Sequence, residues 1–190
     1  HETKPPARFT EASLISELET REIGRPSTYA SIVGTIQNRG YVYKKGTALV
    51  PAWIAFSVIR LMEQHFGRLI EYGFTAELEG VLDDVAGGRE DRVAVLTGFW
   101  TGEGEGNTGL KRLVENLPDI DARGLATFPL GEEIDLRVGR YGPYVEGPPF
   151  TEDAEGKRVP TRANVPEDLP PDELTLDKAK ELLATPAGLE

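Results

Sequence analysis

One short stretch near the start of the chain has the residue types that bind phosphate. It is Arg25-Pro26-Ser27-Thr28, and the residues after it have helical spacing. A helix N-terminus offers unpaired N–H groups and the positive end of the helix dipole. Two hydroxyls and a guanidinium beside it could form a phosphate cradle, such as the backbone of a single strand needs, and its candidate residues are Arg25, Ser27 and Thr28. An ordinary helix start with a solvent-facing Arg25 is the alternative.

A second stretch, residues 137–144, combines arginines with tyrosines in a strand-like segment. Alternation along a strand separates two faces. Exposed aromatic rings beside arginines form a stacking platform, and stacking contributes about 1–3 kcal/mol per base. We therefore predict that Arg140, Tyr141 and Tyr144 bind single-stranded nucleic acid. The alternative is a Gly-Pro hairpin whose tyrosines pack on the closing helix, and one tyrosine stacking while the other packs is also compatible with the sequence.

Weaker candidates lie between these stretches. Gln37 and Arg39 could reach a nucleic acid from the far end of the same helix, or form a solvated helix end. Lys44 and Lys45 are expected in a hairpin turn, where a solvated tip is the simpler interpretation. Tyr29 belongs to an apolar stripe, so we interpret it as a packing residue and not as a nucleophile.

The first hundred residues show helix and hairpin patterns. Thr10 is a good N-cap, and Pro26 fits at the start of a second helix, with Ser27 or Thr28 as its cap. Two short strand-like runs, 41–43 and 48–50, flank a turn at 44–47. Further helices are expected at about 53–66, after a cap at Thr75, at about 89–100, and at 111–117, with a loop at 102–106. The order of two helices followed by a hairpin is that of a winged helix.

Composition changes after Pro118. Short strand candidates and Gly/Pro turns follow, and then one helix that begins at Thr175. We therefore predict an α+β protein with a mainly helical, winged-helix-like domain at 1–118. A small domain of antiparallel sheet plus helix is expected at 119–190.

Charge and composition narrow the classes of function. The net charge is −11, but residues 1–70 carry nine Lys and Arg against six Asp and Glu, while residues 71–190 carry twelve against twenty-six. Local patches, not totals, decide nucleic-acid binding. The chain has no cysteine and two histidines, which cannot build a zinc site. We expect no metal site, no hydrolase triad and no membrane span. The start at His1 without a methionine suggests an internal fragment.

Longer stretches resemble a known family. Residues 5–100 contain PPARFTEASLISELE, IGRPSTYASIVGTIQNRGYV and LMEQHFGRLIEYGFTAELEGVLDDVAGG. They resemble the part of bacterial type IA DNA topoisomerase I that follows its catalytic-tyrosine domain. Residues 134–184, with LRVGRYGPYVEG and the closing LTLDKAKELLATP, resemble one unit of the repeated C-terminal domain of these enzymes, of the cysteine-free actinobacterial type.

The resemblance implies a function. The family relaxes negatively supercoiled DNA without ATP, by transient single-strand cleavage at a tyrosine and strand passage. Its acidic Mg²⁺-binding domain and its tyrosine domain precede the region matched here, so this chain is expected to lack both, to need no cofactor itself and to carry no catalytic residue. The expected partners are single-stranded DNA and the missing N-terminal domains. The expected location is the cytoplasm, at the nucleoid.

Two other functions remain open at this point. One is a free-standing winged-helix regulator that binds duplex DNA, although Ser31, Gly34, Thr35 and Asn38 on the second helix are poorly suited to reading bases. The other is a partner-binding module, suggested by the acidic second half of the chain.

Overall fold

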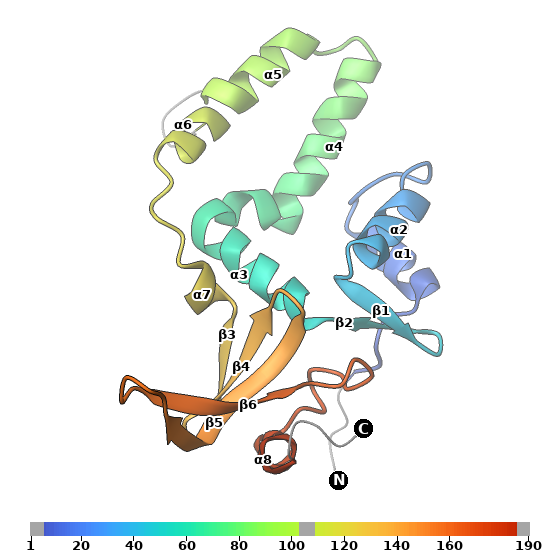
Figure 1. The fold of residues 1–190 in the computed structure, drawn as a ribbon. Helices are drawn as coiled ribbons and strands as arrows, with labels where there is room; N and C mark the ends of the chain where they lie inside the picture. The colour runs from blue at the N-terminus through green and yellow to red at the C-terminus, as the bar shows by residue number, and fades with distance from the viewer. Residues whose placement is uncertain (1–5, 103–108, 186–190) are drawn as a thin grey trace. The chain divides into compact units, whose positions relative to one another are not determined.

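The computed structural model describes residues 6–102 and 109–185 (Figure 1). The predicted loop at 102–106 therefore lies almost wholly outside the described residues. The chain divides into two compact units. Unit 1 comprises His1–Arg39, Lys44–Leu49 and Val58–Ile120. Unit 2 comprises Gly40–Tyr43, Val50–Ser57 and Asp121–Glu190.

The N-terminal half is helical apart from one hairpin. Its elements are α1 (Glu11–Thr20), α2 (Tyr29–Asn38), β1 (Val42–Lys45), β2 (Ala48–Pro51), α3 (Trp53–Phe66), a 3₁₀ turn η1 (Gly67–Ile70), α4 (Tyr72–Ala86), α5 (Arg92–Thr101) and α6 (Leu110–Glu115). The predicted order of two helices, a hairpin and further helices is confirmed. Thr10 caps α1 by accepting a hydrogen bond from the Ser13 N–H at 3.2 Å, and the Ser13 hydroxyl accepts one from the Thr10 N–H.

Thr28, one of the two predicted caps, stands at the N-cap position of α2, which begins at Tyr29. Its hydroxyl bonds back to the backbone of Arg25 and makes no capping hydrogen bond. Two other predicted boundaries are wrong. Helix α4 begins at Tyr72 with Glu71 at the cap position, so Thr75 lies inside it. Lys44 and Lys45 belong to strand β1, and the turn is formed by the two residues after them.

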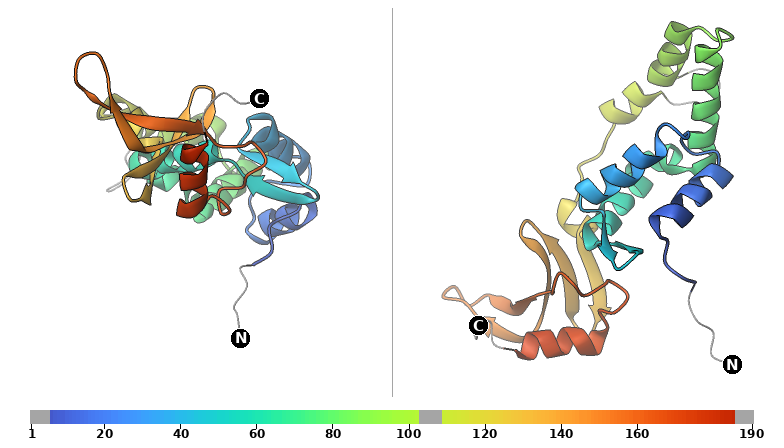
Figure 2. Two further views of the ribbon diagram at one scale, coloured as in Figure 1. Left: turned by 60° about the horizontal axis from the view of Figure 1, so that its bottom comes forward. Right: turned by 90° about the vertical axis from the view of Figure 1, so that its right-hand side faces the viewer.

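Unit 2 contains the expected antiparallel sheet and closing helix. A short helix α7 (Ala122–Leu125) is followed by β3 (Thr127–Gly131), β4 (Ile134–Gly139), β5 (Gly142–Glu152), β6 (Arg158–Asn164) and α8 (Leu176–Ala184). The strands pair in the order β3-β4-β5-β6, all antiparallel. Thr175 caps α8 as predicted, by accepting a hydrogen bond from the Lys178 N–H. Helix α8 packs on β5 and β6 (Figure 2).

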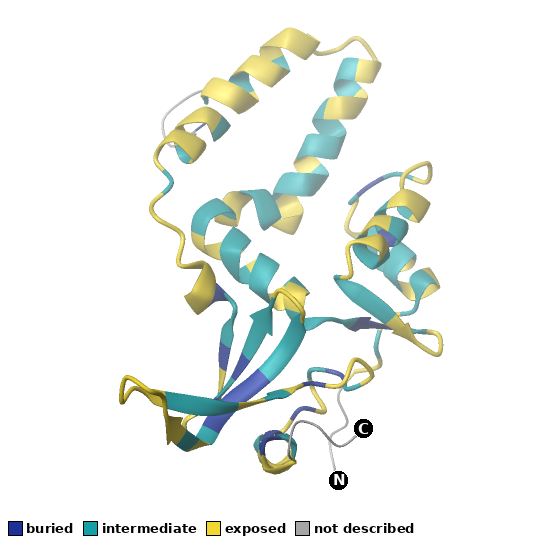
Figure 3. Ribbon diagram, viewed as in Figure 1, coloured by how far each residue is buried: buried dark blue, intermediate teal, exposed yellow. Residues whose placement is uncertain are grey.

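The two units differ in how much they bury (Figure 3). The core of unit 2 lies between the sheet and α8, and it contains Phe128, Ile134, Leu136, Val145, Val165, Leu174, Ala179 and Leu183. In unit 1, helices α4, α5 and α6 have no fully buried residue. Large apolar side chains such as Val93, Leu96 and Trp100 are between 49% and 62% exposed.

Candidate nucleic-acid interface

Arg25, the first predicted phosphate ligand, is held by an acid of helix α4. Its Nε and Nη2 both donate to Oδ2 of Asp83, at 3.2 and 2.7 Å. Its Nη1 donates to the carbonyls of Gly24 at 2.7 Å and Glu22 at 3.3 Å. The hydrogen bonds and charge of Asp83 raise the pKa of Arg25 above its ordinary value. Because a guanidinium has five N–H groups, a single N–H, on Nη2, is left for another acceptor among the described residues.

The turn around Arg25 is compact. The Thr28 hydroxyl accepts from the Arg25 N–H at 2.9 Å and donates to the Arg25 carbonyl at 3.0 Å. The N–H groups of Thr28 and Tyr29 donate to the same carbonyl. Ser27 is exposed. The structure thus brings Arg25, Ser27 and Thr28 into one turn, while most of its polar groups bond within the protein.

Tyr29 packs in this turn. A Cβ placed on buried Gly24 would lie 3.2 Å from the Tyr29 ring and 2.9 Å from Ile32, so only glycine fits there. Gly24 also has a φ of +78°, which favours glycine for a second reason. The ring of Tyr29 is therefore part of the packing that shapes the turn.

The two candidates at the end of α2 differ. The Gln37 side-chain amide donates to Oε1 of Glu11 at 2.9 Å and to the Val33 carbonyl at 3.2 Å, so it faces helix α1. Lys44 also reaches Oε1 of Glu11, at 2.8 Å. Arg39 follows the helix and is exposed, with no ion pair to any residue that the structure describes.

In unit 2, the predicted residues lie on and beside the sheet face that turns away from the core. Strand pairing places Arg137 opposite Tyr144 and Glu146 opposite Arg162. Paired residues share a face, and Leu136 and Val145 occupy the other face, where the core lies. Tyr144 is therefore not packed on α8.

A buried carboxylate organises this face. The side chain of Glu146 is 7% exposed, and it binds two arginines. Oε1 accepts from Nε of Arg137, and Oε2 accepts from Nε of Arg162 at 3.0 Å. Arg137 also donates to the Thr127 hydroxyl. Burying a carboxylate is tolerated only when it is paired and hydrogen-bonded, and the group of three side chains keeps one net positive charge.

Two arginines flank the two tyrosines. Arg140 and Tyr141 form the turn between β4 and β5, and the Arg140 guanidinium lies 5.7 Å from the Tyr141 ring centre. Tyr141 is 95% exposed. The Arg162 guanidinium lies 5.6 Å from the ring centre of Tyr144. The structure brings the three predicted residues together at one end of the sheet.

A groove of about 400 Å³ joins these side chains. It is lined by Gly139, Arg140, Tyr141, Gly142, Tyr144, Arg162, Ala163 and Asn164. Arg162 was missed by the sequence argument, although a signal was present: Val159, Thr161 and Ala163 alternate with Arg158, Pro160 and Arg162, which is the pattern of a strand with one polar face.

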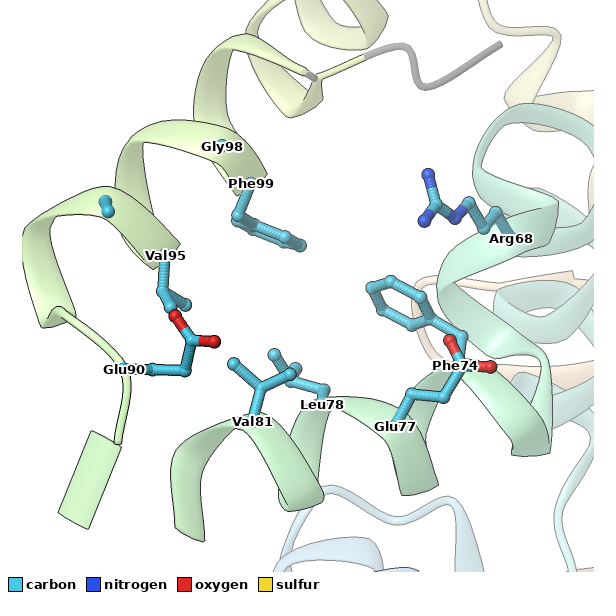
Figure 4. A pocket seen from close by; sticks show the side chains of 10 residues that line it. Arg68, Phe74, Glu77, Leu78, Val81, Glu90, Val95, Gly98 and Phe99 are labelled. Carbon is cyan, nitrogen blue, oxygen red and sulfur yellow. The ribbon is translucent and has the colours of Figure 1, made fainter. Parts of the chain in front are cut away.

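A second hollow lies in unit 1, where α4 and α5 face each other (Figure 4). Its floor is apolar, with the rings of Phe74 and Phe99 at 6.4 Å and Arg68 5.3 Å from the Phe74 ring centre. Glu77 and Glu90 line it too, so its lining has two carboxylates against the one guanidinium of Arg68. This excess of negative charge does not suit a phosphate backbone.

The described part of the chain contains no group of three or more His, Cys, Asp or Glu side chains arranged to hold a metal. None of its helices is both long and apolar enough to cross a membrane.

Comparison with known proteins identifies the family. The profile described as DNA topoisomerase matches residues 1–97, and the profile described as topoisomerase C-terminal repeat matches residues 127–190. The chain belongs to the DNA topoisomerase family. The resemblance found in the sequence is thereby confirmed, both for the first half and for the repeat unit.

This topoisomerase chain is similar to longer relatives. It is 55% identical to DNA topoisomerase 1 of Streptomyces coelicolor over 99% of its own length and 21% of the relative. It is 52% identical to DNA topoisomerase 1 of Mycolicibacterium smegmatis, and the match covers 98% of this chain and 21% of the relative. The solved structure of full-length topoisomerase I from Thermotoga maritima matches 88% of this chain and 26% of that chain, with a TM-score of 0.59 and 30% identity. The chain thus spans about a fifth of the length of these curated relatives.

Proposed function

We propose that this chain holds single-stranded DNA for a bacterial type IA DNA topoisomerase I, which relaxes negatively supercoiled DNA by transient cleavage and strand passage. The steps of cutting and resealing then belong to other parts of the enzyme. Membership of the family supports this proposal, as does the small share of the relatives' length that the chain covers.

The observation that carries the proposal is the pairing of exposed tyrosines with arginines in unit 2. Tyr141 is almost fully exposed, and Tyr144 lines the groove beside Arg162. Flat rings offer every base a stacking surface, and guanidinium groups beside them attract phosphates. This combination binds a single strand with little preference for sequence, because neither ring nor charge reads the edges of bases.

Unit 1 supplies a second set of contacts in this proposal. Arg25, Ser27 and Thr28 would meet the backbone of the strand, with Gln37 and Arg39 further along α2. Arg39 is exposed and suits this role as it stands. Arg25 has one N–H left, so a phosphate that binds it through two N–H groups must displace Asp83.

The rest of the enzyme is the other proposed partner. Half-exposed Val93, Leu96 and Trp100 on α5 are more apolar than a solvated helix face needs. We infer that domains outside this chain cover that face. Such an enzyme would work in the cytoplasm, at the nucleoid.

Binding measurements with labelled DNA test the proposal. The chain should bind a single strand more tightly than a duplex of the same length, at both of two salt concentrations. Affinity should fall as salt rises, because arginines release counterions from phosphates. Equal or tighter binding of the duplex would overturn the proposal.

A relaxation assay tests the division of labour. Incubation of the chain with negatively supercoiled plasmid should give no relaxation, with or without Mg²⁺, because the family's metal and tyrosine domains precede the region matched here. A covalent DNA adduct on Tyr29, or on any other tyrosine of the chain, would show that this part is wrong.

The order of two helices and a hairpin favours one other function, a winged-helix protein that binds duplex DNA. In that case α2 would enter the major groove, where it presents Ser31, Thr35 and Asn38. A clear preference for duplex over single strand in the binding measurement would select this function.

A further inference from the structure

A third pair of arginine and aromatic ring lies on the polar face of the sheet, beyond the groove. The guanidinium of Arg158 stands 3.5 Å from the ring centre of Phe150, which is the contact distance of a flat stack. It is closer than the pairs at Tyr141 and Tyr144, in which guanidinium and ring centre lie 5.7 and 5.6 Å apart.

The strand register places this pair on the same face as the groove. Along β6, Asn164 pairs with Tyr144, Arg162 with Glu146, Pro160 with Phe150 and Arg158 with Glu152. These four residues of β6 alternate regularly, so they share one face. Strand β5 has its irregularity between Gly147 and Phe150, and this brings Phe150 back to the face of Tyr144.

Two parts of the Arg158 guanidinium contact other side chains. Its inner face covers Phe150. Its edge donates to Glu133, from Nη2 to Oε2 at 3.2 Å and from Nη1 to Oε1 at 3.4 Å. The side chain is nevertheless 60% exposed, and among the described residues no second ring lies over the guanidinium. A flat cationic surface is therefore fixed by a ring beneath it and by a carboxylate at its edge.

This arrangement suits a base better than a phosphate. Phosphates bind the N–H edge of arginine. Glu133 takes one N–H group of Nη1 and one of Nη2 along that edge, and its negative charge repels anions. Bases stack on aromatic rings and on guanidinium planes alike. We propose that Arg158, stacked on Phe150, is a further base-stacking site for the same single strand, with the base on the outer guanidinium face. This inference rests on the proposed function of the chain.

The spacing gives the site a measurable consequence. Asn164 and Arg158 are six residues apart on β6, which is about 20 Å at about 3.3 Å per residue. A strand of about 4 nucleotides, the lower end of site sizes for single-strand binders, fills the groove at Tyr141 and Tyr144 only. A strand of about 20 nucleotides reaches Arg158 as well.

The test compares Arg158→Lys with the wild-type chain on oligothymidylates of about 20 and about 4 nucleotides. Lysine keeps the charge and loses the plane. We expect the variant to bind the long strand at least about fivefold more weakly, the lower end of the effect of one stacked base. Affinity for the short strand and the salt dependence should be unchanged. Phe150→Leu should act in the same way, because Arg158 then loses its support.

Arg89→Lys is the matched control. Arg89 is 65% exposed and pairs with Asp84 at 2.6 Å, and no aromatic ring in the described part of the chain lies over its guanidinium. The Arg89→Lys variant should bind the long and the short oligothymidylate as the wild type does. Thermal melting of each variant checks that the fold is intact.

The possible failures are distinguishable. Unchanged binding of the long strand by Arg158→Lys, alongside weaker binding by Tyr141→Ala, overturns this site alone. An equal loss on short and long strands also overturns it, because the effect is then not that of a distant site. Arg158→Ala could instead flatten the salt dependence of binding, while Arg158→Lys keeps both the salt dependence and the affinity of the wild type. That result would make Arg158 a phosphate contact and overturn the stacking site. A wild-type chain that fails to bind single strands overturns the proposed function, and this site with it.

Discussion

In both units a carboxylate binds an arginine that is a candidate DNA contact, but the two carboxylates have opposite effects on that arginine. In unit 1 the acid is exposed and occupies the contact: Asp83, 56% exposed, takes two N–H groups of Arg25. In unit 2 the acid is buried beneath the contact: Glu146, 7% exposed, holds Arg162 from below and leaves the groove open. For the arginines that are proposed to meet phosphates, burial of the acid would decide whether it competes with DNA for the arginine or positions the arginine for DNA.

The two arrangements also differ in what they contribute to folding. An exposed ion pair is screened by water and salt, so its loss changes stability little. Removing one member of a buried pair leaves an uncompensated charge in a dry environment, which costs about 3–5 kcal/mol. The platform of unit 2 is thus tied to its fold, whereas the Arg25 turn is free to exchange its partner.

The largest expected effect follows from removing the buried acid. Glu146→Ala should lower the free energy of unfolding by about 3–5 kcal/mol, because Arg137 loses its partner while only 15% exposed. Denaturant unfolding of the full chain measures this. Glu133→Ala is the matched control, since it also pairs with an arginine but is 64% exposed. If both variants lose equally little free energy of unfolding, the contrast between a buried and an exposed acid does not hold.

The next effect concerns the exposed ring. Tyr141→Ala should weaken single-strand binding by about 1–3 kcal/mol, the contribution of one stacked base. Its melting temperature should stay close to that of the wild type, because a side chain that is 95% exposed contributes little packing. Tyr144→Ala should weaken binding too, with some loss of stability, because Tyr144 also contacts Arg162. A Tyr141→Ala chain that binds normally would remove the platform from the proposed function.

Sequence patterns were enough for the order of the elements, and they grouped Arg140, Tyr141 and Tyr144, which the structure brings to one end of the sheet. Local signals fixed the caps at Thr10 and Thr175, the hairpin at 42–51 and the polar end of the sheet, because all of these depend on residues close in the chain. The partners of the site residues could not be found in this way. Asp83 lies 58 residues from Arg25, and Arg162 lies 16 residues from Glu146. Such pairs form only when the fold brings distant segments together, and a single sequence contains no record of them.

A smaller effect is expected at the exposed pair of unit 1. In a chain that already carries Tyr141→Ala and Tyr144→Ala, Arg25→Ala should flatten the log–log salt dependence of single-strand binding by up to about 0.7, the value for one neutralised phosphate. Asp83→Asn should strengthen binding, since it releases two N–H groups of Arg25. Asp84→Asn is the control, because Asp84 pairs with Arg89 instead. If Asp83→Asn and Asp84→Asn strengthen binding equally, the effect of Asp83 comes from the loss of one negative charge and not from the release of Arg25.

The smallest effect should appear at Glu11, the second exposed acid that occupies a candidate contact. Hydrogen bonds from Lys44 and then Gln37 lower the pKa of Glu11 below the ordinary value of a glutamate side chain. A lowered pKa in the folded state means that the ionised carboxylate stabilises the fold. This stabilisation is fully present above the ordinary pKa of glutamate, about 4.3, and it is lost as pH falls through the lowered value.

Glu11→Gln should therefore melt slightly below the wild type at pH 7, and the difference should vanish in acid, below the lowered pKa. Glu19→Gln, on the same helix, is the control for the loss of one carboxylate charge. A Glu11→Gln difference that persists unchanged in acid would mean that the carboxylate is not the stabilising group.

The same variant also bears on the contrast between the units. With Glu11 neutral, Lys44 and Gln37 are held less strongly, so single-strand binding through unit 1 should rise slightly. If binding falls instead, Glu11 positions its partners as Glu146 does, and exposure alone does not decide the role of an acid.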